Sequence, residues 1–120
     1  MVLDNELAQL LKEGALSYGK ELNQQQVSQF GTYMELLKEW NKKINLTAIE
    51  EDREIIVKHF IDSMSILPYI NIEGQKLIDI GTGAGFPGIP LKIANPQLEV
   101  TLLDSLDKRV KFLNEVISAT

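Results

Sequence analysis

The sequence predicts an α/β protein in which an N-terminal helical segment, residues 1–70, precedes a partial α/β domain, residues 71–120. Three observations support this prediction. Apolar residues recur at helical spacing up to Pro68, the pattern changes to short apolar runs near residue 76, and the first run leads into a glycine-rich turn. The second part then has the order strand, helix, strand, helix, which builds a parallel sheet.

Two helices are expected at the start of the chain. Residues 4–13 place leucines three and four positions apart, and Gly14 is available to end that helix. Asn23 has the character of an N-cap with Gln26 three residues later, and an amphipathic helix of about 20 residues follows. We interpret the aromatic side chains of this helix as part of the core.

A third helical stretch follows an interruption at Asn45-Leu46-Thr47, where two side chains favour local hydrogen bonds. His59, the single histidine, lies three residues before Asp62, so the two could meet on one helix face as a general-base pair. We favour the alternative that hydrogen bonds hold His59 at the seam between helices and sheet. No second histidine or paired carboxylate gives metal-ligand spacing, so no metal site is expected.

The predicted sheet has two strands. Residues 76–80 are apolar apart from Lys76 and Asp79, which predicts a strand buried on both faces. A helix begins at Pro87, and residues 98–103 form the second strand, which ends in Asp104. In such a βαβ unit the crossover is right-handed, and ligands bind beyond the carboxyl ends of the strands. We therefore expect Asp79 and Asp104 at the same ligand-binding edge.

Between the first strand and its helix lies the stretch Gly81-Thr82-Gly83-Ala84-Gly85-Phe86-Pro87-Gly88. Glycines allow a sharp turn and leave no side chain between backbone and ligand. We expect the amides of Gly88 and Ile89 to face the glycine loop as a weakly positive helix end. The third glycine of a dinucleotide fingerprint would fall on Phe86, and a P-loop would need Lys after Gly88, so the spacing matches neither kind of loop. A tight turn without a ligand is the alternative interpretation.

The glycine stretch looks like motif I of the S-adenosylmethionine-dependent methyltransferases, with Asp79 two residues before the run G-x-G-x-G. The methyl donor has no phosphate, so no phosphate-binding lysine is expected, and its methionine carboxylate could meet the amides of the turn. Asp104 follows Gly81 by 23 residues, close to where a carboxylate binds ribose in nucleoside-binding α/β folds. The alternative role for Asp104 is a helix cap, which Ser105 or Asp107 could also provide.

Composition restricts the functional classes. The chain has 120 residues and a formal net charge of −5, whereas an autonomous nucleic-acid binder is usually basic. We interpret the basic residues at positions 38, 42, 43, 53 and 58 as solvated helix faces. There is no cysteine, no apolar run near the ~20 residues of a membrane helix and no signal peptide. These features predict a cytoplasmic protein with no membrane partner.

Taken together, the chain resembles the RsmG (GidB) family, whose members methylate guanine N7 in small-subunit ribosomal RNA. The matching stretches are residues 39–47 (EWNKKINLT), 58–63 (KHFIDS), 79–87 (DIGTGAGFP), 104–109 (DSLDKR) and 112–113. The resemblance implies a helical cap followed by the first βαβα part of a Rossmann-like class I methyltransferase fold. It also implies S-adenosyl-L-methionine as cofactor and small-subunit (16S) ribosomal RNA, or the 30S subunit, as partner.

The resemblance implies site residues as well. Gly81 and Phe86 would contact the methyl donor, and Asp104 would lie near its ribose. The candidate cofactor-binding residues are Asp79, Gly81, Thr82, Gly83, Gly85, Phe86, Asp104 and Ser105, and the candidate RNA contacts are Asn45, Thr47 and His59. Guanine N7 carries no proton, so in-line methyl transfer needs positioning more than a general base, and no catalytic residue is assigned.

Family members carry a full sheet, and this sequence supplies two strands. We therefore expect an N-terminal portion or truncated form with little or no activity. Unpaired strand edges further predict self-association through the exposed edge of the sheet. Two other classes stay open: a nicotinamide-dinucleotide-binding fragment, which the glycine spacing disfavours, and a non-catalytic helical interaction module with a vestigial βαβ unit.

Overall fold

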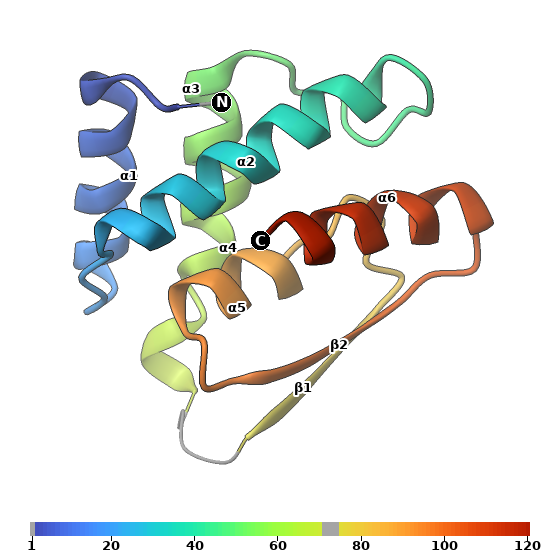
Figure 1. Cartoon of the computed structure of the whole chain (residues 1–120). Coiled ribbons are helices and arrows are strands. Elements are labelled where there is room, and N and C mark those ends of the chain that lie inside the picture. The colour runs from blue at the N-terminus through green and yellow to red at the C-terminus, as the bar shows by residue number, and fades with distance from the viewer. Residues whose placement is uncertain (1, 71–74) are drawn as a thin grey trace.

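The computed structural model describes residues 2–70 and 75–120, so the expected boundary between residues 70 and 71 borders positions outside the described part. The helical segment contains α1 (Asn5–Ser17), α2 (Gln24–Asn41), α3 (Asp52–Glu54), the π-helix η1 (Ile55–Ile61), α4 (Asp62–Met64) and the 3₁₀-helix η2 (Leu67–Tyr69). The α/β part contains β1 (Lys76–Ile80), α5 (Gly88–Ala94), β2 (Glu99–Leu103) and α6 (Asp107–Ala119). Figure 1 shows α5 and α6 on one side of the two strands, with α2 packed beside α6.

The structure confirms the cap that the sequence predicts for α2, but α1 does not end where the sequence predicts. The side chain of Asn23 accepts a hydrogen bond from the Gln26 amide (2.8 Å), and the side chain of Gln26 accepts one from the Asn23 amide (2.9 Å). This capping box begins α2 as expected. Gly14, however, does not end α1. A Cβ added to Gly14 would lie 2.3 Å from Ile61 Cδ1, so glycine at this position allows α1 to pack closely on η1.

The helical stretch at residues 52–64 is not a continuous α-helix. Ile55–Ile61 form a π-helix with one short α-helical turn on either side. π-Helices are rare and occur frequently at functional sites. Phe60 points into the core from this element, and His59, next to it, is partly exposed.

The two strands pair in parallel, with Lys76 opposite Glu99 and Ile80 opposite Leu103. The prediction that β1 is buried on both faces is wrong. Successive side chains of a strand point to opposite faces, and the described helices cover one face only. On the other face Ile78 is 61% exposed and Ile80 is 79% exposed.

One hydrophobic core joins the helical segment to the α/β part. Phe30 of α2 and Phe60 of η1 belong to the same buried cluster as Leu91 of α5 and Phe112 of α6. Removal of apolar surface from water stabilises such a cluster by ~25 cal/mol per Å². The core therefore holds α2 and η1 against the turn between β1 and α5. None of the described helices is both long and apolar enough to cross a membrane.

Candidate functional site

The turn between β1 and α5 requires glycine at three alternate positions. The backbone angle φ is +69° at Gly81, +60° at Gly83 and +98° at Gly85, a region that residues with a Cβ rarely adopt. An added Cβ would meet no atom within 4 Å at Gly81 or Gly83. At Gly85 it would lie 2.5 Å from Ile89 Cδ1 and 2.7 Å from Tyr33 Oη. The first two glycines therefore face open space, and the third is packed against protein.

Asp79 organises this glycine loop, residues 81–86, from the inside. Its Oδ2 accepts hydrogen bonds from the hydroxyl of Thr82 (2.6 Å) and the amide of Gly88 (3.0 Å). The Ile89 amide donates to the carbonyl of Gly85 (2.8 Å). The Ile89 amide thus faces the glycine loop, as expected, and the Gly88 amide donates to Asp79, which anchors that loop. Both amides already have protein acceptors.

Asp104 holds the glycine loop from the second strand. Its Oδ2 accepts from the Gly83 amide (2.9 Å), its Oδ1 accepts from the Leu106 amide (3.0 Å), and Arg109 Nη1 lies 3.7 Å from Oδ2. The Leu106 amide, followed by the Gly83 amide and Arg109, lowers the pKa of this carboxyl, and burial partly opposes them. The side chain of Asp104 is 2% exposed. The structure thus brings Asp79 and Asp104 to one loop, where both carboxylates bind protein amides.

Sequence reasoning assigns Tyr33 to the core and misses its contact with the glycine loop. The ring is fully buried, and its hydroxyl donates a hydrogen bond to the carbonyl of Ala84. Burial, and then the charge of Asp79, raises the pKa of Tyr33 well above its usual value, so the hydroxyl remains a donor. A signal was present in the sequence, because the hydroxyl of a tyrosine in a core stripe needs a hydrogen-bond partner.

His59 contacts the far end of the glycine loop. Its Nε2 lies 2.7 Å from Thr47 Oγ1, and its ring stacks on Phe86 with centroids 4.3 Å apart and planes inclined by 13°. Burial lowers the pKa of His59, and the charge of Asp62 partly opposes this effect, so the imidazole is neutral at pH 7. This geometry agrees with a histidine held at the seam between helices and sheet. Among the described residues, its side-chain hydrogen-bond partner is Thr47 and not Asp62.

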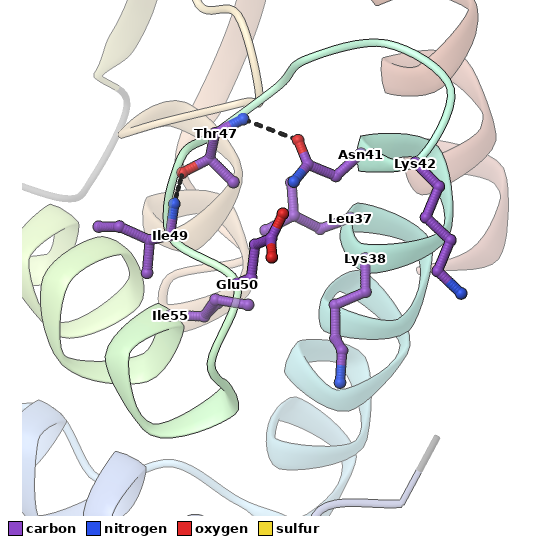
Figure 2. A pocket seen from close by; sticks show the side chains of 8 residues that line it. All are labelled: Leu37, Lys38, Asn41, Lys42, Thr47, Ile49, Glu50 and Ile55. Carbon is purple, nitrogen blue, oxygen red and sulfur yellow. Dashed lines mark hydrogen bonds between the residues drawn. The ribbon is translucent and has the colours of Figure 1, made fainter.

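Segment 42–51, which follows α2, supplies Thr47 to this contact. The Oδ1 of Asn41 accepts from the amides of Leu46 (2.8 Å) and Thr47 (2.9 Å), and Thr47 Oγ1 accepts from the Ile49 amide (3.1 Å). Figure 2 shows this segment arching beside the end of α2. Of the three candidate RNA contacts, Thr47 and His59 meet, and Asn45 is exposed on the segment. A cavity of about 280 Å³ lies beneath it, lined by Leu37, Lys38, Asn41, Lys42, Thr47, Ile49, Glu50 and Ile55.

The remaining candidate, Ser105, is exposed beside Asp104. Within residues 2–70 and 75–120, no three histidine, cysteine or carboxylate side chains gather closely enough to hold a metal ion. The site is therefore a glycine loop with two carboxylates inside it and an aromatic residue, Phe86, at its end. Two residues of the helical segment contact this loop: Tyr33 bonds to Ala84, and His59 stacks on Phe86.

Comparison with known proteins decides the family. The family model described as GidB, rRNA small subunit methyltransferase G, matches residues 26–120. The chain belongs to the GidB family. Ribosomal RNA small subunit methyltransferase G of Acetivibrio thermocellus is 62% identical to it over 111 residues, and that of Alkaliphilus oremlandii is 54% identical over 117 residues. The alignments cover 92% and 96% of this GidB-family chain but 46% and 48% of the relatives.

The chain thus spans about half the length of the curated relatives it matches. The predicted family is confirmed, and so is the predicted fold class, an α/β arrangement that corresponds to an N-terminal part of a methyltransferase. In this GidB-family chain the described part includes the glycine loop together with both carboxylates that hold it.

Proposed function

We propose that this chain carries the methyl-donor half of an S-adenosyl-L-methionine-dependent methyltransferase that modifies guanine N7 in small-subunit (16S) ribosomal RNA. The proposal depends on one observation above all. Three positive-φ glycines lie at the carboxyl edge of parallel strands, and two of them, Gly81 and Gly83, are open to a ligand. The names of the relatives supply the substrate class, small-subunit ribosomal RNA.

The donor would bring a methyl group on a positively charged sulfur, to be taken up by the lone pair of guanine N7. The open backbone at Gly81 and Gly83 admits close approach of such a ligand, and Asp79 and Thr82 would act indirectly by shaping the loop. Asp104 would bind the ribose hydroxyls. A carboxylate has about four lone-pair sites, and two amides occupy two of them here. Because its side chain is 2% exposed, ribose binding requires a shift of the glycine loop.

Ribosomal RNA would lie on the side of the helical segment that carries Asn45, Thr47 and His59. A net charge of −5 gives this chain little general attraction for phosphate, so contacts of this kind would orient RNA more than they would hold it. The partner would be the 30S subunit or its RNA, which places the protein in the cytoplasm.

We expect titration calorimetry to detect binding of S-adenosylhomocysteine and none of NADH, since the glycine spacing lacks a pyrophosphate site. Asp104→Ala should weaken S-adenosylhomocysteine binding about 10-fold or more, because a hydrogen bond to a charged group contributes ~1.5–3 kcal/mol. Asp107→Ala, at an exposed neighbouring carboxylate, is the matched control. Binding of NADH at similar affinity would contradict the proposal. If neither ligand binds to folded chain, the helical interaction module becomes the better interpretation.

We also propose that copies of the chain associate through the bare sheet. Ile78, Ile80 and Leu103 are exposed together on its uncovered face, next to unpaired strand edges. Light scattering should show a mass that rises above 13.5 kDa with concentration, and Ile80→Lys should lower it again. Val57→Lys, on an exposed position of η1, is the control and should leave the mass unchanged. A constant mass of 13.5 kDa at high concentration would rule out this association.

A further inference from the structure

A continuous line of contacts joins segment 42–51 to the glycine loop. The hydroxyl of Thr47 bonds to Nε2 of His59 at 2.7 Å, and the His59 ring stacks on Phe86 at 4.3 Å. Phe86 directly follows the last glycine of the loop and also packs against Tyr33 (5.8 Å between centroids) and Phe60 (6.2 Å). Three rings of the helical segment therefore pack against Phe86.

The hydroxyl of Thr47 links two partners. Its oxygen accepts from the Ile49 amide at 3.1 Å, and it shares a second hydrogen bond with Nε2 of His59, whose direction depends on the tautomer of the imidazole. Thr47 therefore ties the backbone of segment 42–51 to the histidine ring. His59 lies on a π-helix, and π-helical turns are frequent at functional sites.

We propose that Thr47 and His59 are positioning residues through which occupancy of the glycine loop by the methyl donor is coupled to the order of segment 42–51. Thr47 orients the imidazole, the flat face of the imidazole holds Phe86, and Phe86 sets the end of the loop. The inference rests on the donor site proposed above. It adds a link between that site and the segment that carries candidate RNA contacts.

Coupling of this kind works equally in both directions. If an ordered segment tightens donor binding by some factor, donor binding must stabilise the ordered segment by the same factor. The Ile49 amide reports on the segment, because it donates to Thr47 Oγ1. The Gly85 amide, which donates to the Thr82 carbonyl at 3.0 Å, reports on the loop. The rates of amide hydrogen exchange at Ile49 and Gly85 therefore report on the order of the segment and of the glycine loop.

The central comparison is Thr47→Val against Thr47→Ser in the full chain, with S-adenosylhomocysteine as the probe. Valine removes the hydroxyl with little change in shape, and serine keeps it; Thr32→Val makes the same change at a half-buried position of α2. We expect Thr47→Val to weaken binding about 5- to 10-fold, at the lower end of the range for coupled sites, and the other two variants to stay within about two-fold. In the unchanged chain, saturating ligand should slow Ile49 exchange by a similar factor.

A second variant separates positioning from a general loss of stability. His59→Phe keeps a flat ring over Phe86 but removes the bond to Thr47, so it should weaken binding as Thr47→Val does. Without ligand, Thr47→Val should speed exchange at Gly85 together with Ile49.

Three results would count against these ideas, each in a different way. Unchanged Gly85 exchange in ligand-free Thr47→Val overturns the positioning role, whether or not the ligand binds. Equal affinity of the unchanged chain and Thr47→Val for S-adenosylhomocysteine overturns the coupling and leaves the donor site intact. Failure of the folded, unchanged chain to bind S-adenosylhomocysteine overturns the donor site itself, and the coupling with it.

Discussion

Replacement of Gly85 by alanine is expected to lower the free energy of unfolding by about 2 to 5 kcal/mol, the sum of two costs. A left-handed backbone costs a residue with a Cβ ~1–2 kcal/mol, and φ at Gly85 is +98°. The new methyl group would also lie 2.5 Å from Ile89 Cδ1 and 2.7 Å from Tyr33 Oη, and overpacking of this kind costs ~1–3 kcal/mol. Domains are stable by only ~5–15 kcal/mol, so the loss is a large fraction of the total.

Gly19→Ala is the matched control for this experiment. Gly19 has a φ of +82°, and an added Cβ there would meet nothing within 4 Å. The Gly19→Ala variant should therefore lose only the ~1–2 kcal/mol that a left-handed backbone costs a residue with a Cβ. Urea unfolding, monitored by circular dichroism, measures the free energy of unfolding that each variant loses. Equal losses at the two positions would contradict the close packing of Tyr33 and Ile89 on the glycine loop.

Replacement of Asp79 by alanine is expected to cost about 3 to 6 kcal/mol of unfolding free energy, because it removes two hydrogen bonds to a charged acceptor, each of which contributes ~1.5–3 kcal/mol. The partners left behind are the Gly88 amide and the hydroxyl of Thr82, and both residues are buried. The glycine loop would lose its inner anchor. We therefore expect binding of S-adenosylhomocysteine to be lost as well as stability.

Two control variants test whether the charge and the acceptor oxygen both matter. Asp79→Asn keeps one oxygen to accept the same bonds and should lose about half as much stability as Asp79→Ala. Asp107→Ala removes a carboxylate that is 81% exposed and lies 3.3 Å from Lys111, an arrangement that contributes no more than about 0.5 kcal/mol. If Asp79→Ala were no more harmful than Asp107→Ala, the anchoring role of Asp79 would be wrong.

The elements that the sequence predicted correctly depend on neighbours along the chain. The first strand occupies residues 76–80 as predicted, and the capping box at Asn23 begins α2. The three glycines adopt the left-handed angles that their spacing requires. Each of these depends on local backbone preference or on hydrogen bonds between residues a few positions apart. Short-range signals of this kind can be read directly from a sequence.

Other features depended on contacts between distant parts of the chain. The sequence correctly predicted that Asp79 and Asp104 lie at the same edge of the sheet. The backbone amides that donate hydrogen bonds to them could not be predicted, because these bonds form only when the glycine loop and both strands come together. The hydroxyl of Tyr33 bonds to a residue 51 positions away. His59 forms its side-chain hydrogen bond with Thr47, twelve residues back, and the sequence did not indicate this partner.

By itself, the sequence determined the family, the βαβ order and the position of the glycine loop. The tertiary structure decided that Gly14 is a packing position and that one face of the sheet is bare. It also decided that Tyr33, Thr47 and His59 surround the glycine loop. The physical reason is that local propensity and spacing determine which elements form, whereas the partner of a side chain depends on which elements the shared hydrophobic core brings together.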